Sequence, residues 1–154
     1  MNIPDLQEIN MKFTLFIIAA FIIWFSSIWV AVLSLLSFIG GWKTLSRLYP
    51  LTFASEGHNA VKYSMSSIKM GFVNYRSCVN VFFTETGIIF KIMKIFSVMH
   101  KPLFIPYDKI SEAQQGKLFI STYTSFIIEN KKITIYGKAG DELFLRLKSR
   151  GISG

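Results

Sequence analysis

Cysteine and histidine are scarce in this chain, which limits the sites that it can build. Its 154 residues include one cysteine, Cys78, and two histidines, His58 and His100. A single thiol excludes an internal disulfide, which suits a reducing compartment. The two histidines lie far apart, and neither neighbours Cys78 or a cluster of carboxylates. Because one histidine alone cannot make a metal site, we expect no metal and no cofactor.

The motifs of common active sites are missing as well. There is no HExxH, CxxC, G-x-S-x-G, P-loop or dinucleotide-binding pattern. The stretch "GKAGDE", residues 137–142, lacks the Lys-Ser/Thr that follows in a phosphate-binding loop, so it is interpreted as a turn and a helix cap. Cys78 lies among apolar strand residues and is interpreted as a small core residue rather than a nucleophile. We therefore expect a protein that is not an enzyme.

The sequence allows three roles for His100. Imidazole titrates near neutrality, so this residue is a candidate pH-sensitive group or ligand. A histidine in such a place more often bonds a loop carbonyl, and this is the interpretation we favour.

Charge and proline are absent from one long stretch, the 27 residues 13–39. As a helix this stretch is about 40 Å long, more than the roughly 30 Å of a bilayer's hydrocarbon core, and tilt can absorb the surplus. A core helix apolar on every side would need a much larger protein around it. The sequence therefore predicts one transmembrane helix, preceded by a short leader of residues 1–12.

A cleaved signal peptide is the alternative for this stretch. Such a peptide has a basic leader, a shorter apolar region and a small-residue cleavage site. Here the leader holds Asp5 and Glu8 against Lys12, and no Ala-x-Ala pattern follows the apolar run. These features favour an uncleaved anchor.

The orientation follows from the basic residues at the ends of the helix. Only Lys12 precedes it, whereas Lys43, Arg47 and Lys62 follow. Since basic residues are retained on the cytoplasmic side, the N-terminus is predicted to lie outside and residues 40–154 inside. The predicted location is the inner (cytoplasmic) membrane, crossed once.

Positive charge dominates the rest of the chain. Sixteen of the 17 Lys and Arg residues follow Gly41, but only seven of the nine Asp and Glu residues do, which leaves a formal charge of +9 there. Nucleic acid is one partner that such a charge suggests, but the basic residues are scattered and no recognised binding fold or Arg-rich stripe is present. A membrane surface with anionic lipid headgroups is the simpler partner, and no nucleic acid is expected.

Residues 40–50, "GGWKTLSRLYP", are predicted to form a juxtamembrane connector. Gly40 and Gly41 can end the membrane helix, and apolar residues then recur at helical spacing. Trp and Tyr favour the membrane–water boundary and basic residues favour anionic headgroups, so candidate membrane-surface contacts are Trp42, Lys43, Arg47 and Tyr49. The alternative is a short amphipathic connector that docks on its own domain.

A second candidate surface is the basic and apolar run "FKIMKIFSVMHK", residues 90–101. Its candidate membrane-surface contacts are Lys91, Lys94, Phe96 and Lys101, with lysines on phosphates and apolar side chains inserted. The alternative is an ordinary hairpin end whose apolar side faces the core. Nothing in the sequence decides between the two.

The remaining residues, 51–154, predict a mainly β domain. Alternating patterns indicate strands near residues 61–66, 79–84, 88–93, 117–129 and 131–137, with Gly87 able to take a positive φ in the turn before the third. "PLFIP" is another short strand because its prolines forbid a helix, with Leu103 and Ile105 on one side and Ile110 closing the core. A terminal helix starts with Asp141 as its cap and stops at Gly151. The fold predicted is a small β-barrel or sandwich plugged by this helix.

This order of elements resembles the pleckstrin-homology-like (PH-like) superfamily with its GRAM-type and bacterial branches. The resemblance is carried by the strand–turn–strand "VNVFFTETGIIFKI" and by "PLFIPYDKI", in which Tyr107, Asp108, Lys109 and Ile110 follow the Ile-Pro end of a strand. Residues 41–148 are also similar to a group of short bacterial membrane proteins with "GW..L...Y", "Y..C" and "HPPL.IPW..I" stretches. In the last of these, Lys101 replaces a proline and Tyr107 a tryptophan. The resemblance implies a scaffold rather than a defined activity.

Two hypotheses for the function follow. In the first, the membrane helix presents a PH-like module at the cytoplasmic face, where it binds a protein partner or anionic headgroups. In the second, the chain is a structural subunit of a larger membrane complex assembled through that helix. Self-association is a related candidate, because small residues lie roughly on one side of the helix, namely Ala20, Ser27, Ala31 and Ser34.

Overall fold

The computed structural model describes residues 3–52 and 60–152. Its helices are α1 (Ile3–Ile39), α2 (Trp42–Leu48) and α3 (Lys138–Ser149). Its strands are β1 (Val61–Met70), β2 (Val73–Phe83), β3 (Gly87–Ile92), β4 (Leu103–Pro106), β5 (Ser111–Leu118), β6 (Ser121–Ile128) and β7 (Lys131–Tyr136), with short 3-10 helices η2 (Lys94–Phe96) and η3 (Tyr107–Lys109). His58 and the polar loop around it lie outside the described residues.

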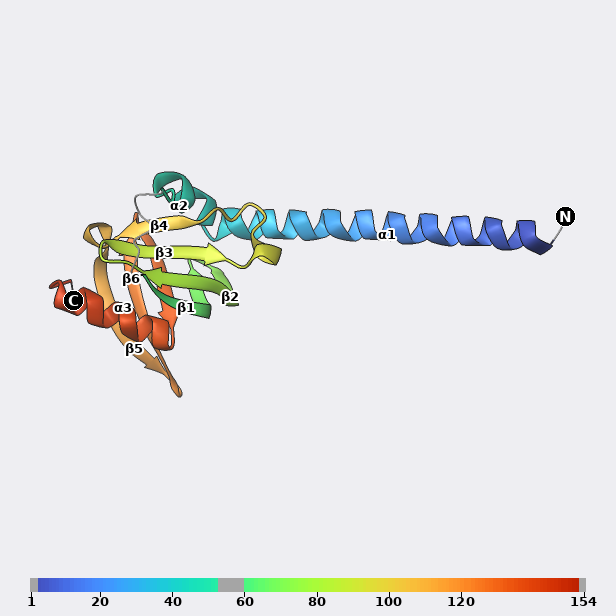
Figure 1. Cartoon of the computed structure of the whole chain (residues 1–154). Coiled ribbons are helices and arrows are strands. Elements are labelled where there is room, and N and C mark those ends of the chain that lie inside the picture. Colours follow the sequence, from blue (N-terminus) through green and yellow to red (C-terminus); the bar gives the residue numbers. More distant parts are fainter. Residues whose placement is uncertain (1–2, 53–59, 153–154) are drawn as a thin grey trace.

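Helix α1 projects as a long rod from the β domain (Figure 1). Between Leu6 and Ile39 it is long and apolar enough, by length and composition, to cross a membrane. The helix also continues into the predicted leader, where Lys12 lies 2.7 Å from the carboxylate of Glu8 one turn earlier. Its last turns contact the domain, since Leu33 and Ser37 are buried there.

The β domain is one curled antiparallel sheet with the strand order β4-β3-β2-β1-β7-β6-β5. One meander comprises β1 to β4 and a second comprises β5 to β7, and β1 pairs with β7 to join them. Helix α3 packs on the second meander through Leu143 and Leu147, both fully buried. The predicted fold class is therefore confirmed in its elements: one apolar helix, then a mainly β domain with a terminal helix.

The short strand between prolines was predicted correctly. Strand β4 pairs with β3, and Leu103 and Ile105 are fully buried, while Ile110 also joins the core. The other edge of β4 meets the end of the connector, where the Phe104 amide donates to the Tyr49 carbonyl at 3.0 Å. This contact fastens the connector to the sheet.

Three stretches of strand were not predicted. Strand β1 extends to Met70, four residues beyond its predicted end. Strand β2 begins at Val73, six residues before the predicted start, and β5 covers the polar stretch "SEAQQGKL". In β5, an edge strand, only Ala113 is buried, so no alternating pattern marks it. Edge strands of this kind are held by backbone pairing rather than by burial of their side chains.

The predicted cap of the terminal helix was wrong. Helix α3 begins at Lys138, and Gly137, with φ 68°, precedes it, so Asp141 is already the fourth helical residue. Its side chain accepts a hydrogen bond from Gln115 of β5 at 3.0 Å instead of capping the helix. The glycine supplies the backbone conformation that turns the chain from β7 into the helix.

The role predicted for Gly87 was also wrong, because its φ is not positive. The turn before it is closed by the Thr84 hydroxyl, which donates to the Gly87 carbonyl at 2.9 Å and accepts from the Gly87 amide at 3.0 Å. A Cβ at residue 87 would lie 2.4 Å from the Ile105 carbonyl oxygen. Glycine is needed here for the close approach of β4.

Candidate functional site

The junction between α1 and the β domain is the candidate site, because most of the predicted contact residues surround it. Two hydrogen bonds hold α1 to the domain: the Tyr75 hydroxyl donates to the Leu36 carbonyl at 3.3 Å, and the Ser37 hydroxyl donates to the Met99 carbonyl at 2.8 Å. Gly41, with φ 78°, then turns the chain directly into α2. The junction is thus packed and hydrogen-bonded on both sides.

Trp42 lies in the core and not on a surface, which corrects its prediction as a membrane contact. Its side chain is fully buried, and its indole N–H donates to the Lys101 carbonyl at 2.8 Å. The rings of Tyr75, Phe90 and His100 pack edge-on against it, with centroids 5.4 to 6.5 Å away. Leu45 is fully buried as well, so α2 docks on its own domain through its apolar face.

The other three predicted contact residues of the connector remain accessible. Lys43 is half-buried and Arg47 is exposed. Tyr49 is half-buried, and its hydroxyl donates to Glu129 at 2.6 Å. This hydrogen bond, together with partial burial of the hydroxyl, raises the pKa of Tyr49 to about 12. Tyr49 therefore contacts a neighbouring loop of its own domain.

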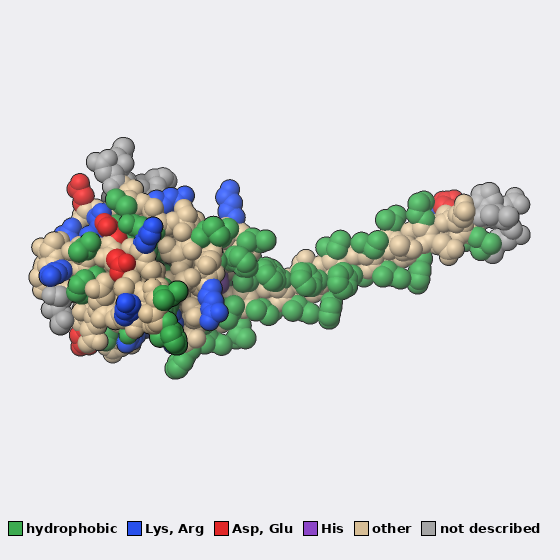
Figure 2. Space-filling view, turned by 90° about the horizontal axis from the view of Figure 1, so that it is seen from below, with side chains coloured by type: hydrophobic (Ala, Val, Ile, Leu, Met, Phe, Trp, Pro, Cys, Tyr) green, Lys and Arg blue, Asp and Glu red, His purple; other side chains and the backbone are tan. Residues whose placement is uncertain are grey.

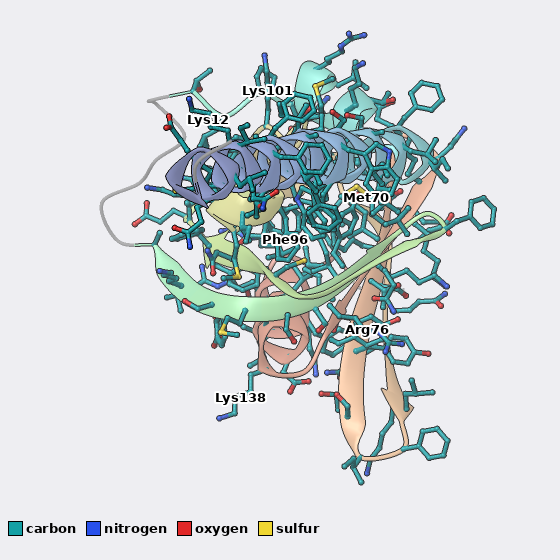
Figure 3. The ribbon with its side chains drawn as sticks, turned by 90° about the vertical axis from the view of Figure 1, so that its right-hand side faces the viewer. Lys12, Met70, Arg76, Phe96, Lys101 and Lys138 are labelled. Atoms are coloured by element: carbon teal, nitrogen blue, oxygen red, sulfur yellow. The ribbon has the colours of Figure 1, made fainter. Side chains whose placement is uncertain are left out.

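The predicted surface of residues 90–101 lies beside α1. Phe96 is half-buried, and its ring centre is 5.8 Å from that of Trp29 in α1. Lys94 and Lys101 are exposed, and Lys91 is half-buried over the ring of Phe82 at 5.5 Å. Seen along α1, Lys101 lies on one side of the helix and Phe96 on the other (Figure 3). The structure thus brings Phe96 and Lys101 to the base of α1.

Basic side chains occur at the end of the domain from which α1 emerges, whereas the acidic ones visible on this face lie farther away (Figure 2). Arg76 of β2, which was not predicted as a site residue, is exposed, and in the view along α1 it lies farther from the helix than Phe96 does (Figure 3). The sequence around Arg76 does not alternate regularly between apolar and polar residues, so neither this part of β2 nor Arg76 was predicted.

An apolar groove of about 620 Å³ separates the last turns of α1 from β2 and β3. Its walls include Trp29, Val32, Leu36, Cys78 and Ile92. Arg76 also lines it and is exposed, which places it at the rim. Burial raises the pKa of the Cys78 thiol, so the protonated form is favoured, in keeping with its interpretation as a packing residue.

A row of aromatic rings leads along α1 to this groove. Phe21, Phe25 and Trp29 stack at intervals of four residues, with ring centres 6.2 and 6.4 Å apart, and Phe96 of the domain continues the row. The spacing i, i+4, i+8 is visible in the sequence and places the three helical rings on one face. It was not predicted because most residues around it are apolar too.

Two exposed apolar tips were also missed. Phe72, between β1 and β2, is 92% exposed, and Phe119 and Ile120, between β5 and β6, are 91% and 100% exposed. A smaller pocket of about 320 Å³ lies between these tips and includes Lys69, Lys132 and two tyrosines, Tyr123 and Tyr136. Within residues 3–52 and 60–152, no three His, Cys, Asp or Glu residues lie together in a way that could hold a metal.

His100 is 2% exposed and bonds a loop carbonyl, as predicted. Its Nδ1 lies 2.8 Å from the Val98 carbonyl oxygen and its Nε2 lies 3.2 Å from the Tyr75 hydroxyl. Because a carbonyl only accepts, the proton of the neutral ring is on Nδ1, so Nε2 and the Leu36 carbonyl share the single proton of the Tyr75 hydroxyl. Burial lowers the pKa of His100 below its usual 6.5, although the bond to Val98 opposes this.

Acid is therefore expected to weaken the junction. The unfolded chain binds a proton on this histidine more readily than the folded chain, so its contribution is complete above about pH 6.5 and declines as the pH falls toward the lowered pKa. The thermal midpoint should fall more between pH 7.5 and 5.5 in the natural protein than in His100→Gln. Equal pH dependence in the two proteins would contradict this expectation.

Comparison with protein-family models and with curated proteins found no match. Among solved structures, the chain is similar to the Vps36 N-terminal PH domain, with 16% sequence identity and a TM-score of 0.47. The similarity covers 68% of this chain and 90% of that domain.

Proposed function

We propose that the protein is a non-catalytic membrane-anchored module, held by α1 at the cytoplasmic face, whose basic surface binds anionic lipid headgroups. Residues 1–12 are the leader, 13–39 the anchor helix, 40–50 the connector and 51–154 the PH-like domain. The binding surface comprises the basic and aromatic side chains around the base of α1, namely Lys43, Arg47, Arg76, Lys91, Lys94, Phe96 and Lys101.

The observation that carries this proposal is the division of the apolar run at Leu33. Leu33 and Ser37 are buried against the domain, whereas the large apolar side chains of residues 13–32 are exposed and only Trp29, near the end of this stretch, stacks on the domain. Twenty helical residues are about 30 Å long, which equals the thickness of the hydrocarbon core. The surplus length that tilt was expected to absorb is thus used for docking. Trp29 then lies near one interface, where tryptophan is favoured, and Lys12 marks the other.

If residues 13–32 cross the hydrocarbon core, the base of α1 lies at the bilayer surface. Lys94 and Lys101 then lie at the level of the headgroups, and each basic side chain near an anionic surface contributes about 1 kcal/mol. Tethering keeps the domain at high effective concentration near the lipid, so weak contacts suffice.

Hydrogen exchange of the full chain in lipid nanodiscs tests this function. Amides of residues 93–101 are expected to exchange more slowly in nanodiscs of phosphatidylglycerol than in nanodiscs of phosphatidylcholine. Helix α3 is the internal control, because it packs on the second meander, away from α1. Equal exchange of residues 93–101 in the two lipids would contradict headgroup binding.

Anchoring and orientation are checked separately in cells. A fluorescent protein fused after Gly154 should be active, and alkaline phosphatase fused there should be inactive, because the first matures in the cytoplasm and the second outside it. The chain should also stay in the membrane at alkaline pH and leave it in detergent. Release without detergent would contradict the anchor, and an active phosphatase would contradict the orientation.

A further inference from the structure

We infer that the groove at the base of α1 is a lipid-binding site that holds one acyl chain of an anionic phospholipid, with the phosphate on Arg76. This inference rests on the proposed anchoring of α1, and it names one bound lipid rather than a surface of headgroups. The groove, of about 620 Å³, lies within the range of 300–1,000 Å³ that is typical of small-molecule sites.

The apolar wall of the groove is continuous with the part of α1 that projects from the domain. Phe21, Phe25 and Trp29 form one row on the helix, and Trp29 also lines the groove. Trp29 and Val32 remain 38% and 49% exposed. A hydrocarbon chain lying along this row therefore enters the groove without crossing a polar region, and it covers apolar surface that the domain leaves open.

The charge at the rim selects an anion. Arg76 is exposed at the groove, and none of the described residues that line the groove is acidic. A guanidinium binds phosphate with two parallel hydrogen bonds. It favours an anionic lipid over a zwitterionic one, because a zwitterionic headgroup already carries a cation beside its phosphate. An anionic phospholipid meets both the apolar wall and the cationic rim.

A second copy of α1 fits this groove less well. At 3.6 residues per turn, the small residues that favour helix pairing, Ala20, Ser27, Ala31 and Ser34, lie about half a turn from Trp29, Val32 and Leu36. The hydroxyls of Ser27 and Ser34 donate to carbonyls of their own helix, at Ile23 and Val30. Pairing through that stripe leaves the groove face open to lipid.

Photolabelling in nanodiscs tests the site on the full chain. The probes are phosphatidylglycerol and phosphatidylcholine that carry the same diazirine in one acyl chain, and mass spectrometry identifies the labelled peptides. Phosphatidylglycerol is expected to label residues 72–78 and 92–96. Val32→Trp, which fills the groove from the helix side, should reduce this labelling about tenfold, because the chain loses its place against the wall.

Val30→Trp is the matched control, since Val30 is similarly exposed, at 43%, but lies on another face of α1. Its labelling should equal that of the natural protein. Arg76→Gln should lower the preference for phosphatidylglycerol over phosphatidylcholine about fivefold, as expected for one exposed charge-assisted contact. Lys138→Gln, an exposed position at the start of α3, should not change it.

Two outcomes would overturn the inference: equal labelling by the two lipids, or equal labelling in Val32→Trp and Val30→Trp. Each variant is also extracted at alkaline pH. A chain that stays in the membrane but fails these tests refutes the groove site alone, whereas a chain that is released refutes the anchor on which the site rests.

Discussion

Trp42→Ala is expected to lower the free energy of unfolding of the β domain by about 3–5 kcal/mol, the usual cost of deleting a fully buried tryptophan. The side chain is 0% exposed, and its loss leaves a cavity among Tyr75, Phe90 and His100. It also removes the donor to the Lys101 carbonyl. Since small domains are stable by only about 5–15 kcal/mol, this loss is a large part of the total.

The measurement is thermal unfolding of the full chain in detergent, followed by near-ultraviolet circular dichroism. Trp42→Phe should cost less, because it keeps most of the apolar volume, although it also loses the hydrogen bond. Trp24→Ala is the matched control: Trp24 is 61% exposed on the projecting part of α1, so the domain should unfold at its normal temperature. If Trp42→Ala and Trp24→Ala unfold alike, the connector is not part of the core.

Gly140→Ala is expected to destabilise the domain by about 1–3 kcal/mol, although alanine is the better helix former. The gain in helix propensity is about 1 kcal/mol. Against it, a Cβ at residue 140 would lie 2.4 Å from the Ile135 carbonyl oxygen and 3.1 Å from the Thr124 nitrogen, both backbone atoms. The Thr124 hydroxyl also donates to the Gly140 carbonyl at 2.8 Å, which holds α3 close to β6. Helix and strands must separate, and overpacking of this kind outweighs the propensity gain.

Gly116→Ala is the matched control for this substitution. Its Cβ would also meet atoms at 2.4 Å, but these are at the far end of the half-buried Tyr123 side chain, which can shift at less cost than backbone atoms. The expected change is within about 1 kcal/mol, measured by the same thermal unfolding. A stabilised Gly140→Ala protein would show that α3 is not held as closely to the sheet as the distances indicate.

The packing of Trp42 has a consequence for how the protein works. Because α1 turns at Gly41 straight into a helix whose first residue is in the core, no flexible linker separates the anchor from the domain. The domain is therefore held in one orientation relative to α1. In the proposed function, this fixed orientation keeps Lys94, Phe96 and Lys101 toward the bilayer.

Much of the fold was predictable because it depends on local patterns. The apolar run of residues 13–39, the strand around Leu103 and Ile105 and the amphipathic terminal helix all have a signal within a few neighbouring residues. Strand β5 was not predictable in this way, because its partner supplies hydrogen bonds and its side chains stay in solvent. The start of α3 was misplaced since a glycine, not the expected Asp141, makes the turn.

The candidate site was predictable only in part. Lys94, Phe96 and Lys101 were selected from one basic and apolar run, and the structure places Phe96 and Lys101 beside α1. Arg76 was not selected, because it reaches the same place from another strand. Trp42 was selected for the wrong surface, since a tryptophan beside basic residues has the same composition whether it faces lipid or a core.

The sequence by itself determined the class of the protein: one apolar helix, a basic β domain and a terminal helix, because charge and hydrophobic periodicity are local properties. Only the tertiary structure decided where the apolar run divides, that the connector belongs to the core and that a groove lies beside Arg76. These features arise where α1, the connector and β2 meet, and a contact between residues distant in the chain leaves no pattern within any one of them.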